Sequence, residues 1–284
     1  MGAIGIAEQS LAEGDLVHSL SALMDKVRND PSNVENRVFL FQLLAILGQW
    51  DRALTQLKVV GELDAITLAM VQTYRPALHC EVFRAGVFDG KRSPLVFGNP
   101  EQWIALLLEA LKLSAQGQLE KSQTLREEAF EQATVTSGVI NEQPFEWIAD
   151  ADPRLGPTLE CILNGRYYWI PFNKIREINI EEPCDLRDEV WMPAYFTWAN
   201  GGEAVGLIPT RYPGTEKSED SQLVRAKKTA WIEQEKDLFL GLGQRMLATD
   251  QGEYPIMDIR NIKLNVATTE STTQSSSEPQ PSDI

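Results

Sequence analysis

The spacing of apolar residues divides the chain into two parts. From about residue 11 to residue 136, apolar residues recur at three- and four-residue steps, as in Leu40, Leu43, Leu44 and Leu47, and proline is scarce. This period is typical of amphipathic helices. From about Asn141, prolines separate short apolar or aromatic runs, which is the pattern of short strands joined by turns. The sequence therefore predicts an α+β protein, with a helical N-terminal part followed by a small, mainly antiparallel β part.

The helical part contains a repeat with a period of 34 residues, which is the tetratricopeptide length. Five residues of the first copy recur in the second: Gly14, Ser19, Leu20, Leu23 and Asp30 return as Gly48, Ala53, Leu54, Leu57 and Asp64. A small residue at Ser19 and Ala53 lets two helices approach closely, and Pro31 follows the second helix of the first pair. A weaker copy, out of phase, begins at Gly117. Chance similarity within an ordinary helical bundle is the alternative, and the agreement of period, small residue and proline favours tetratricopeptide-like repeats.

Glycine and proline predict where regular structure stops. The stretch 84–100 is rich in both and predicts a loop that interrupts the helical array. In the β part, Leu159–Asn164 predicts a short helix that Gly165 ends, and Gly252 predicts a hairpin turn at Thr249–Glu253. The predicted strands are Tyr167–Ile170, Ile175–Ile180, Ala194–Trp198, Ala204–Ile208, Arg245–Ala248 and Ile256–Ile262.

The change of pattern near Val135–Pro144 predicts a boundary between two folding units. We expect a helical unit at residues 1–140 and a β-rich unit at residues 141–266. Residues 267–284 are rich in Ser, Thr and Gln and contain no Lys or Arg. Such a segment has little apolar surface to bury, so we expect a disordered tail.

The charge of the chain argues against two classes of partner. Asp and Glu total 41 and Lys and Arg total 26, so the net charge is −15, which argues against nucleic acid or an anionic membrane as the main partner.

No apolar run approaches the roughly 20 residues that span a bilayer, and the first residues lack the basic region of a signal peptide. The three cysteines form no Cys-x-x-Cys pair, which suits a reducing compartment. We expect a cytoplasmic protein.

The residues that usually carry catalysis or bind metals are scarce. Both histidines, His18 and His79, lie in the helical part, without the spacing of a zinc site or a plausible triad partner. Gly241–Met246 begins like a dinucleotide fingerprint, but Met246 replaces the third glycine. We therefore expect no metal and no cofactor.

Asp150-Ala151-Asp152 is a candidate for chemistry, because two acids one residue apart can chelate Mg²⁺ or Mn²⁺. The structural interpretation is that an Asp ahead of Pro153 and Arg154 bonds nearby backbone amides or the guanidinium. We favour it, because a three-residue motif is weak on its own. An enzyme that acts on a polar substrate through Asp150, Asp152, Arg154 and Arg211 is the alternative function.

In order and spacing, six segments resemble the ImpE family, also called TagJ. They are Phe145–Pro157, Gly165–Pro171, Arg187–Ala194, Pro209–Glu216, Thr229–Trp231 and Gly241–Arg245. The resemblance implies a non-catalytic, cytoplasmic accessory protein of bacterial type VI secretion systems. It further implies that the protein binds a short helix of the small sheath subunit (TssB-like) and associates with the ClpV ATPase of the disassembly machinery. A chaperone-like or structural adaptor outside secretion is a third hypothesis.

Two groups of residues are candidates for partner binding. Helix-pair repeats present a groove lined by the first helix of each pair, which suits an amphipathic helix. In the second repeat this helix is predicted at about Val34–Leu47, and its register points Glu35, Val38, Gln42, Ala45 and Ile46 toward the groove. If the β part supplies the binding face instead, Trp147, Tyr168 and Tyr212 are the candidates, because aromatic residues are enriched in interface hot spots.

Overall fold

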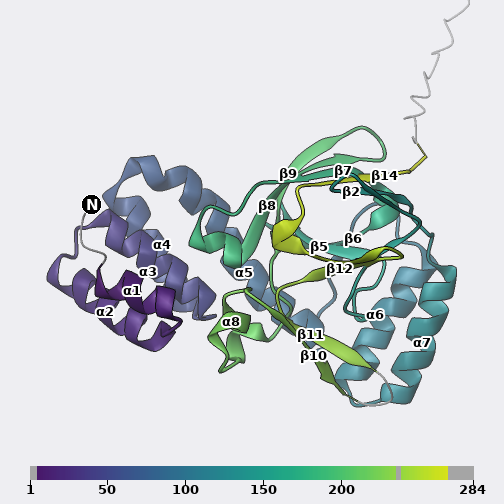
Figure 1. Cartoon of the computed structure of the whole chain (residues 1–284), viewed down its shortest axis with the longest axis horizontal. Coiled ribbons are helices and arrows are strands. Elements are labelled where there is room, and N and C mark those ends of the chain that lie inside the picture. The colour runs from purple at the N-terminus through teal and green to yellow at the C-terminus, as the bar shows by residue number, and fades with distance from the viewer. Residues whose placement is uncertain (1–4, 235–237, 268–284) are drawn as a thin grey trace, which may run out of the picture.

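The computed structural model describes residues 5–234 and 238–267, and joins an array of helices to a twisted sheet (Figure 1). The expected α+β class is confirmed. The main helices are α1 (Ile6–Glu13), α2 (Leu16–Asn29), α3 (Val34–Ile46), α4 (Trp50–Leu63), α5 (Leu68–Phe88), α6 (Gln102–Ala115) and α7 (Leu119–Gln132), with a short α8 (Ser221–Val224). Helices α1–α4 form one end of the molecule, α6 and α7 lie at the other, and α5 runs between them.

Three helix pairs, α1/α2, α3/α4 and α6/α7, turn in the same way. Each first helix is followed by a glycine with positive φ: Gly14 at 84°, Gly48 at 65° and Gly117 at 74°. Glycine adopts this left-handed conformation without the steric cost that a Cβ imposes. The helix pairs of the predicted repeat are therefore present, including the weaker third copy.

The small residue of each repeat lies five positions after that glycine and is fully buried. Ser19 donates a hydrogen bond to the Ala7 carbonyl at 2.7 Å, and Ser122 donates to the Ala110 carbonyl at 2.6 Å. Ala53, the third member, is also buried between helices. A hydroxyl that bonds the neighbouring helix lets the two backbones lie close without an unsatisfied polar group.

Helix α5 is longer than the sequence predicted. Residues 84–88, expected in a loop, form its last turn, because the Arg84 side chain is buried and bonded to Glu160 of the sheet. Within the remainder of that expected loop, Leu95–Val96 forms β1, which pairs in parallel with β6 (Arg166–Pro171).

The main sheet has nine strands in the described residues, in the order β1-β6-β5-β9-β8-β7-β14-β2-β3, and only β1/β6 among its described pairs is parallel. The other strands are β2 (Gly138–Ile140), β3 (Gln143–Phe145), β5 (Thr158–Leu163), β7 (Ile175–Ile180), β8 (Trp191–Trp198), β9 (Glu203–Pro209) and β14 (Asn261–Leu264). Two small sheets complete this part: β13-β12-β4 with β4 (Ile148–Asp150), β12 (Met246–Thr249) and β13 (Gly252–Pro255), and the pair β10 (Thr229–Glu233) and β11 (Phe239–Gly243).

Two predicted elements of the β part are wrong and the hairpin is right. Leu159–Asn164 was expected as a helix, but its residues up to Leu163 lie in β5, because pairing with β6 and β9 buries every side chain of that strand. Ile256–Ile262 was expected as one strand, but Ile256–Asp258 is a 3-10 turn and β14 begins at Asn261. Strands β12 and β13 form the predicted hairpin around Thr249–Gly252.

One hydrophobic cluster contains residues of both predicted folding units. Trp191 on β8 packs against Trp50 of α4 and Tyr74 of α5, with ring centroids 6.3 and 5.6 Å apart. Further along α5, Phe83 and Phe88 pack against Tyr167 and Trp169 of β6 in the same way. A second cluster consists of β-part residues, with Phe97 packed against it. The division into units at 1–140 and 141–266 stays a prediction about folding, and the predicted tail lies almost wholly outside the described residues.

Replacing Ala53 tests the helix-pair contact. Ala53→Leu should lower the free energy of unfolding by about 1–3 kcal/mol, because the added atoms overpack a buried helix crossing. Chemical denaturation measures the change. Ala105→Leu, on the exposed side of α6, is the matched control and should leave the midpoint nearly unchanged. An Ala53→Leu midpoint equal to the wild-type one would contradict the assigned contact.

Candidate functional site

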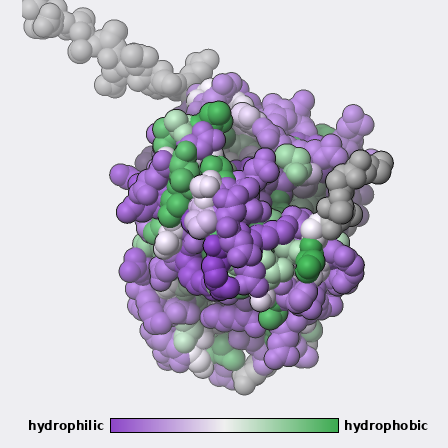
Figure 2. Space-filling view, turned by 90° about the vertical axis from the view of Figure 1, so that its left-hand side faces the viewer, coloured by the Kyte–Doolittle hydropathy of each residue, from purple (hydrophilic) through white to green (hydrophobic). Residues whose placement is uncertain are grey.

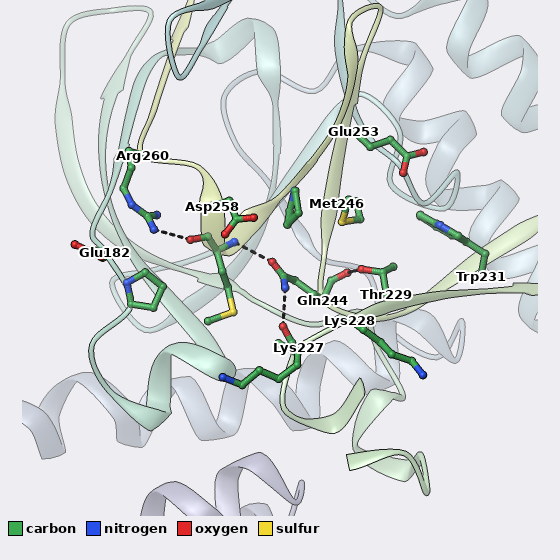
Figure 3. A pocket seen from close by; sticks show the side chains of 14 residues that line it. Glu182, Lys227, Lys228, Thr229, Trp231, Gln244, Met246, Glu253, Asp258 and Arg260 are labelled. Carbon is green, nitrogen blue, oxygen red and sulfur yellow. Dashed lines mark hydrogen bonds between the residues drawn. The ribbon is translucent and has the colours of Figure 1, made fainter. Parts of the chain in front are cut away.

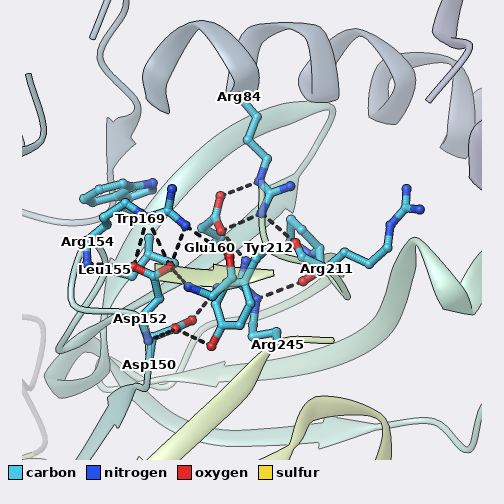
Figure 4. Close-up of polar contacts among 12 residues, drawn as sticks. Arg84, Asp150, Asp152, Arg154, Leu155, Glu160, Trp169, Arg211, Tyr212 and Arg245 are labelled. Carbon is cyan, nitrogen blue, oxygen red and sulfur yellow. Dashed lines mark hydrogen bonds and ion pairs between the residues drawn. The ribbon is translucent and has the colours of Figure 1, made fainter. Parts of the chain in front are cut away.

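Glu160 is the centre of a buried ionic network between α5 and the sheet (Figure 4). Its carboxylate accepts hydrogen bonds from Arg84 Nε at 2.6 Å and Arg84 Nη2 at 2.9 Å. It also accepts short hydrogen bonds from the Tyr167 hydroxyl and from Arg245 Nη2. The carboxylate of Glu160 and the guanidinium of Arg245 are fully buried, and one carboxylate therefore ties α5, β5, β6 and the start of β12 together.

Asp150 is the second acid of this network. It forms a short ion pair with Arg245, accepts a hydrogen bond from the Tyr212 hydroxyl at 3.0 Å, and accepts another from the Asp152 amide at 2.9 Å. The lower left of Figure 4 shows these side chains converging on the Asp150 carboxylate. Because three donors of the chain itself bind the Asp150 carboxylate, this side chain stabilises the fold.

Burial and neighbouring positive charges shift the pKa of each acid in opposite directions. Burial dominates for Asp150, and the positive charges dominate for Glu160. Burial raises the pKa of Asp150 to about 7, against the attraction of Arg245. Burial also works to raise the pKa of Glu160, but the positive charges of Arg84 and Arg245 outweigh it and hold that pKa at about 2. Glu160 is therefore ionised over the whole physiological range, because two guanidinium groups face it.

Asp152 and Arg154 form a local turn, as the favoured interpretation of the Asp-x-Asp motif predicted. Asp152 accepts hydrogen bonds from the Arg154 amide and from Arg154 Nε, both at 2.9 Å. It also accepts one from the Gly241 amide at 2.8 Å, which holds β11 against this turn. The described residues contain no group of three or more His, Cys, Asp or Glu side chains placed to hold a metal ion.

Arg211, the fourth residue of the alternative catalytic set, binds the end of a helix. Its guanidinium is buried and donates to the carbonyl of Ile46 at 2.7 Å and to that of Ala45 at 3.5 Å, in the last turn of α3. Arg225 does the same for α1, donating to the Leu11 carbonyl at 2.7 Å. Cations stabilise the negative end of a helix dipole, so the β part caps the first helix of two repeats.

The residues predicted on α3 are only partly accessible. Glu35 is exposed and Val38 is half-buried, whereas Gln42, Ala45 and Ile46 are buried. Gln42 donates a hydrogen bond to Asp185 at 2.9 Å, in the segment that packs on α3 through the 3-10 helix at 186–189. The chain itself therefore covers this end of α3, and a partner helix would reach those three residues only if the segment moved away. Binding by the α3 residues stays a prediction.

The three aromatic candidates lie in different environments. Tyr212 is buried in the ionic network, and Tyr168 is half-buried with its ring 6.4 Å from that of Phe97. Trp147 is 40% exposed and lies just before β4. Of the three, Trp147 alone presents a large part of its ring to solvent.

Trp147 borders an open apolar groove between the end of α7 and β4, with a volume of about 400 Å³. Phe130 and Val135 lie on the α7 side, Val135 being 74% exposed, and Ile148 and Pro157 contribute to its lining. We call it the Trp147 groove. Gly156 allows its shape, because a Cβ there would lie 2.3 Å from the Phe130 ring. Exposed acids occur near both sides, Glu127 and Glu131 on α7 and Glu146 beside Trp147.

A larger pocket of about 650 Å³ lies between β10 and β13 (Figure 3). Gln244 lies within it, with its side chain donating to the Ala226 carbonyl at 2.6 Å and accepting from the Met257 amide at 3.2 Å. The lining carries acids and bases in balance, and its Lys228 pairs with Asp220 at 2.5 Å. This pocket has no excess charge to select a class of ligand.

Sequence reasoning did not identify Arg84, Glu160 or Arg245 as a network. One signal was available: Glu160 is a charged residue inside the apolar run Leu159–Leu163, and a charge in a buried strand requires a partner. The partners are 76 and 85 residues away along the chain, so local spacing could not name them.

The chain is similar in sequence and in fold to known proteins. Residues 142–263 match the family model described as ImpE protein. The chain is 51% identical over 257 residues to the type VI secretion system accessory component TagJ of Pseudomonas aeruginosa, covering 90% of each chain. The X-ray crystal structure of protein VPA1032 from Vibrio parahaemolyticus has the same fold, with a TM-score of 0.83 at 24% identity over 91% of this chain and 97% of that one. No helix among the described residues is both long and apolar enough to cross a membrane.

Removing the charge of Glu160 tests the network. Glu160→Gln should lower the free energy of unfolding by about 3–5 kcal/mol near neutral pH, because it leaves two buried guanidinium groups undercompensated. In the wild type, the Glu160 charge stabilises the fold above its ordinary pKa of 4.5, and this contribution is lost as the pH falls toward 2. The gap between the two proteins should therefore narrow below pH 4.5.

Denaturation midpoints at several pH values measure this gap. Glu109→Gln removes the same charge from the exposed face of α6 and serves as the control, with little expected effect. A gap that stayed constant from pH 6 to pH 3 would mean that the loss does not arise from the Glu160 charge.

Proposed function

The chain belongs to the ImpE family, and from this premise we propose that it is a non-catalytic accessory protein of a bacterial type VI secretion system. The observation that carries the proposal is the 51% identity to the Pseudomonas aeruginosa accessory component TagJ along nine-tenths of both chains. We place this role in the cytoplasm. The free thiols of Cys80, Cys161 and Cys184 fit a reducing compartment.

The ionic network supports a non-catalytic role. A catalytic acid or base must reach the substrate within hydrogen-bond distance. Asp150 and Asp152 instead direct their carboxylates at Arg245, Arg154 and backbone amides of this chain. Arg211 is likewise engaged with the end of α3. The four residues of the alternative enzyme thus have structural partners.

We further propose that the protein binds a helix of the small sheath subunit, and that this binding links it to the ClpV ATPase. The Trp147 groove is the surface that suits such a helix best, because it is apolar, open and accompanied by exposed acids. An amphipathic helix would place its apolar stripe against Trp147 and Val135 and a basic edge toward Glu127 and Glu131. Glu35 and Val38 on α3 form the second candidate surface.

Titration of the protein with the purified small sheath subunit tests the proposal. Trp147→Ala should weaken binding by about tenfold or more, because a central aromatic residue of an interface typically contributes about 2 kcal/mol. Tyr195→Ala removes an aromatic side chain of similar exposure from β8 and should leave the affinity unchanged. Circular dichroism of both variants checks that they remain folded.

The outcomes separate the function from its site. If the wild-type protein does not bind the small sheath subunit, the proposed partner is wrong. If it binds and Trp147→Ala has no effect while Glu35→Lys with Val38→Asp abolishes binding, the site lies on α3. The link to ClpV requires that the protein with sheath subunit bound also binds purified ClpV, and failure to form this complex contradicts the link.

A further inference from the structure

Three arginines, Arg75, Arg92 and Arg166, differ from the rest. Within residues 5–234 and 238–267, their guanidinium groups form no hydrogen bond and no ion pair, whereas every other arginine has at least one such partner. The chain has a net charge of −15, so acidic partners are plentiful elsewhere. Three unpaired arginines on an acidic protein are free to bind an external anion.

Arg166 lines two adjoining grooves along α5, which we call the α5 grooves, and Arg92 lines one of them. The first has a volume of about 540 Å³ and is lined by both Arg92 and Arg166. The second, of about 520 Å³, lies on the other side of the β5–β6 turn and also includes Arg166. Arg75 is exposed on α5, between Thr73 and Pro76 of the second groove in sequence, and lines neither groove.

The close packing of the β5–β6 turn on α5 separates the two grooves. Gly165, at the tip of that turn, has a φ of 71°, and a Cβ there would lie 2.9 Å from Pro76 of α5. Glycine therefore permits both the backbone conformation of the turn and its contact with the helix. Both grooves include Arg166 in their lining, so they adjoin at this residue.

The first α5 groove has an apolar floor with a basic edge. Val82 and Leu95 are 54% and 43% exposed, and Phe83 also lines the groove. The Arg92 guanidinium lies 5.2 Å from the centre of the Phe83 ring, which orients it without neutralising its charge. Asp51 is the one carboxylate that lines this groove in the described residues, and His79 also faces it.

Apolar side chains also reach the surface outside this groove. Figure 2 shows green patches within the mostly hydrophilic surface of the end that carries the N-terminal helices. Exposed large apolar residues of these helices include Val17, Leu63 and Ile66. None of these three lines the α5 grooves, which combine exposed apolar residues with unpaired arginines.

We propose that the α5 grooves dock an acidic, amphipathic segment of a partner protein. Its carboxylates would bind Arg92 and Arg166, which present planar guanidinium groups suited to bidentate pairing. Its apolar side chains would cover Val82 and Leu95. Charge complementarity selects this occupant, since the basic edge of the α5 grooves repels a basic helix. The surface is therefore distinct from the Trp147 groove, whose neighbouring acids favour the opposite charge.

Peptide titration tests the charge preference. The probes are two fluorescein-labelled amphipathic helical peptides with the same leucine stripe, one with glutamate and the other with lysine at the remaining positions. Fluorescence anisotropy should detect tighter binding of the glutamate peptide to the full chain, with an affinity that falls as salt increases. Arg92→Glu with Arg166→Glu should weaken its binding by about tenfold or more.

A matched double variant controls for net charge. Arg28→Glu with Lys58→Glu makes the same change of charge at exposed positions of α2 and α4, away from the α5 grooves, and should bind like the wild type. Equal loss in both double variants, or no preference for glutamate over lysine, overturns the proposal. Circular dichroism melting should show both variants folded, because the side chains of Arg92 and Arg166 have no hydrogen bonds to lose and the ion pairs of Arg28 and Lys58 are exposed.

A second copy of this chain is the competing occupant. Sedimentation velocity of the wild type and of the Arg92→Glu, Arg166→Glu variant distinguishes it. The proposal expects the same sedimentation coefficient for both proteins. A dimer that dissociates in the variant would assign the grooves to self-association and overturn docking of a partner segment.

Discussion

The carboxylate of Glu160 is the point on which the joint between helices and sheet depends. It lies in the middle of a strand that is buried along its whole length, and it neutralises Arg84 from α5 and Arg245 from the start of β12 at once. Buried charges are costly unless each has a partner with good geometry. The positions of α5, β5 and β12 are thus coupled, because displacing any of them would leave a charge uncompensated. This constraint also accounts for the extra turn of α5, which carries Arg84 to the sheet.

Charge is distributed over this frame in a way that the net value of −15 conceals. The buried and half-buried arginines have partners within the chain. Arg84 and Arg245 pair with carboxylates, and Arg211 and Arg225 donate hydrogen bonds to the ends of helices. The exposed arginines of the α5 grooves form no side-chain hydrogen bond or ion pair within the described residues. Exposed acids lie instead beside residues of the Trp147 groove, so this groove and the α5 grooves differ in the sign of the charges beside them. The two proposed docking surfaces therefore favour partners of opposite charge.

Local signals in the sequence predicted local structure well, and failed where distant residues decide. The glycine and the small residue of each repeat act within one helix pair, so the pattern at Gly14 and Ser19 was sufficient to place the turns and buried contacts. Residues 159–163 have a helix-like apolar run, yet pairing with two strands makes them a strand. The Asp152–Arg154 turn was predictable because its partners are two residues apart, whereas the network around Glu160 joins residues more than 70 positions apart. The residues predicted on α3 were chosen by repeat register alone, which does not include the segment at 184–190 that packs over Gln42.

The arginines that cap α1 and α3 have a consequence for how the protein is made. Ribosomes synthesise the helices first, but the donors for the Leu11 and Ile46 carbonyls arrive 214 and 165 residues later. Until Arg225 is made, the Leu11 carbonyl has only the Gly14 amide as a donor within the chain, and before Trp191 is made the apolar side of the array has no cover. Exposed apolar surface on a nascent chain invites aggregation and chaperone binding. Translation arrest before Arg211 would therefore leave the ends of α1 and α3 without their arginine donors, although β1 to β9 precede that point in the chain.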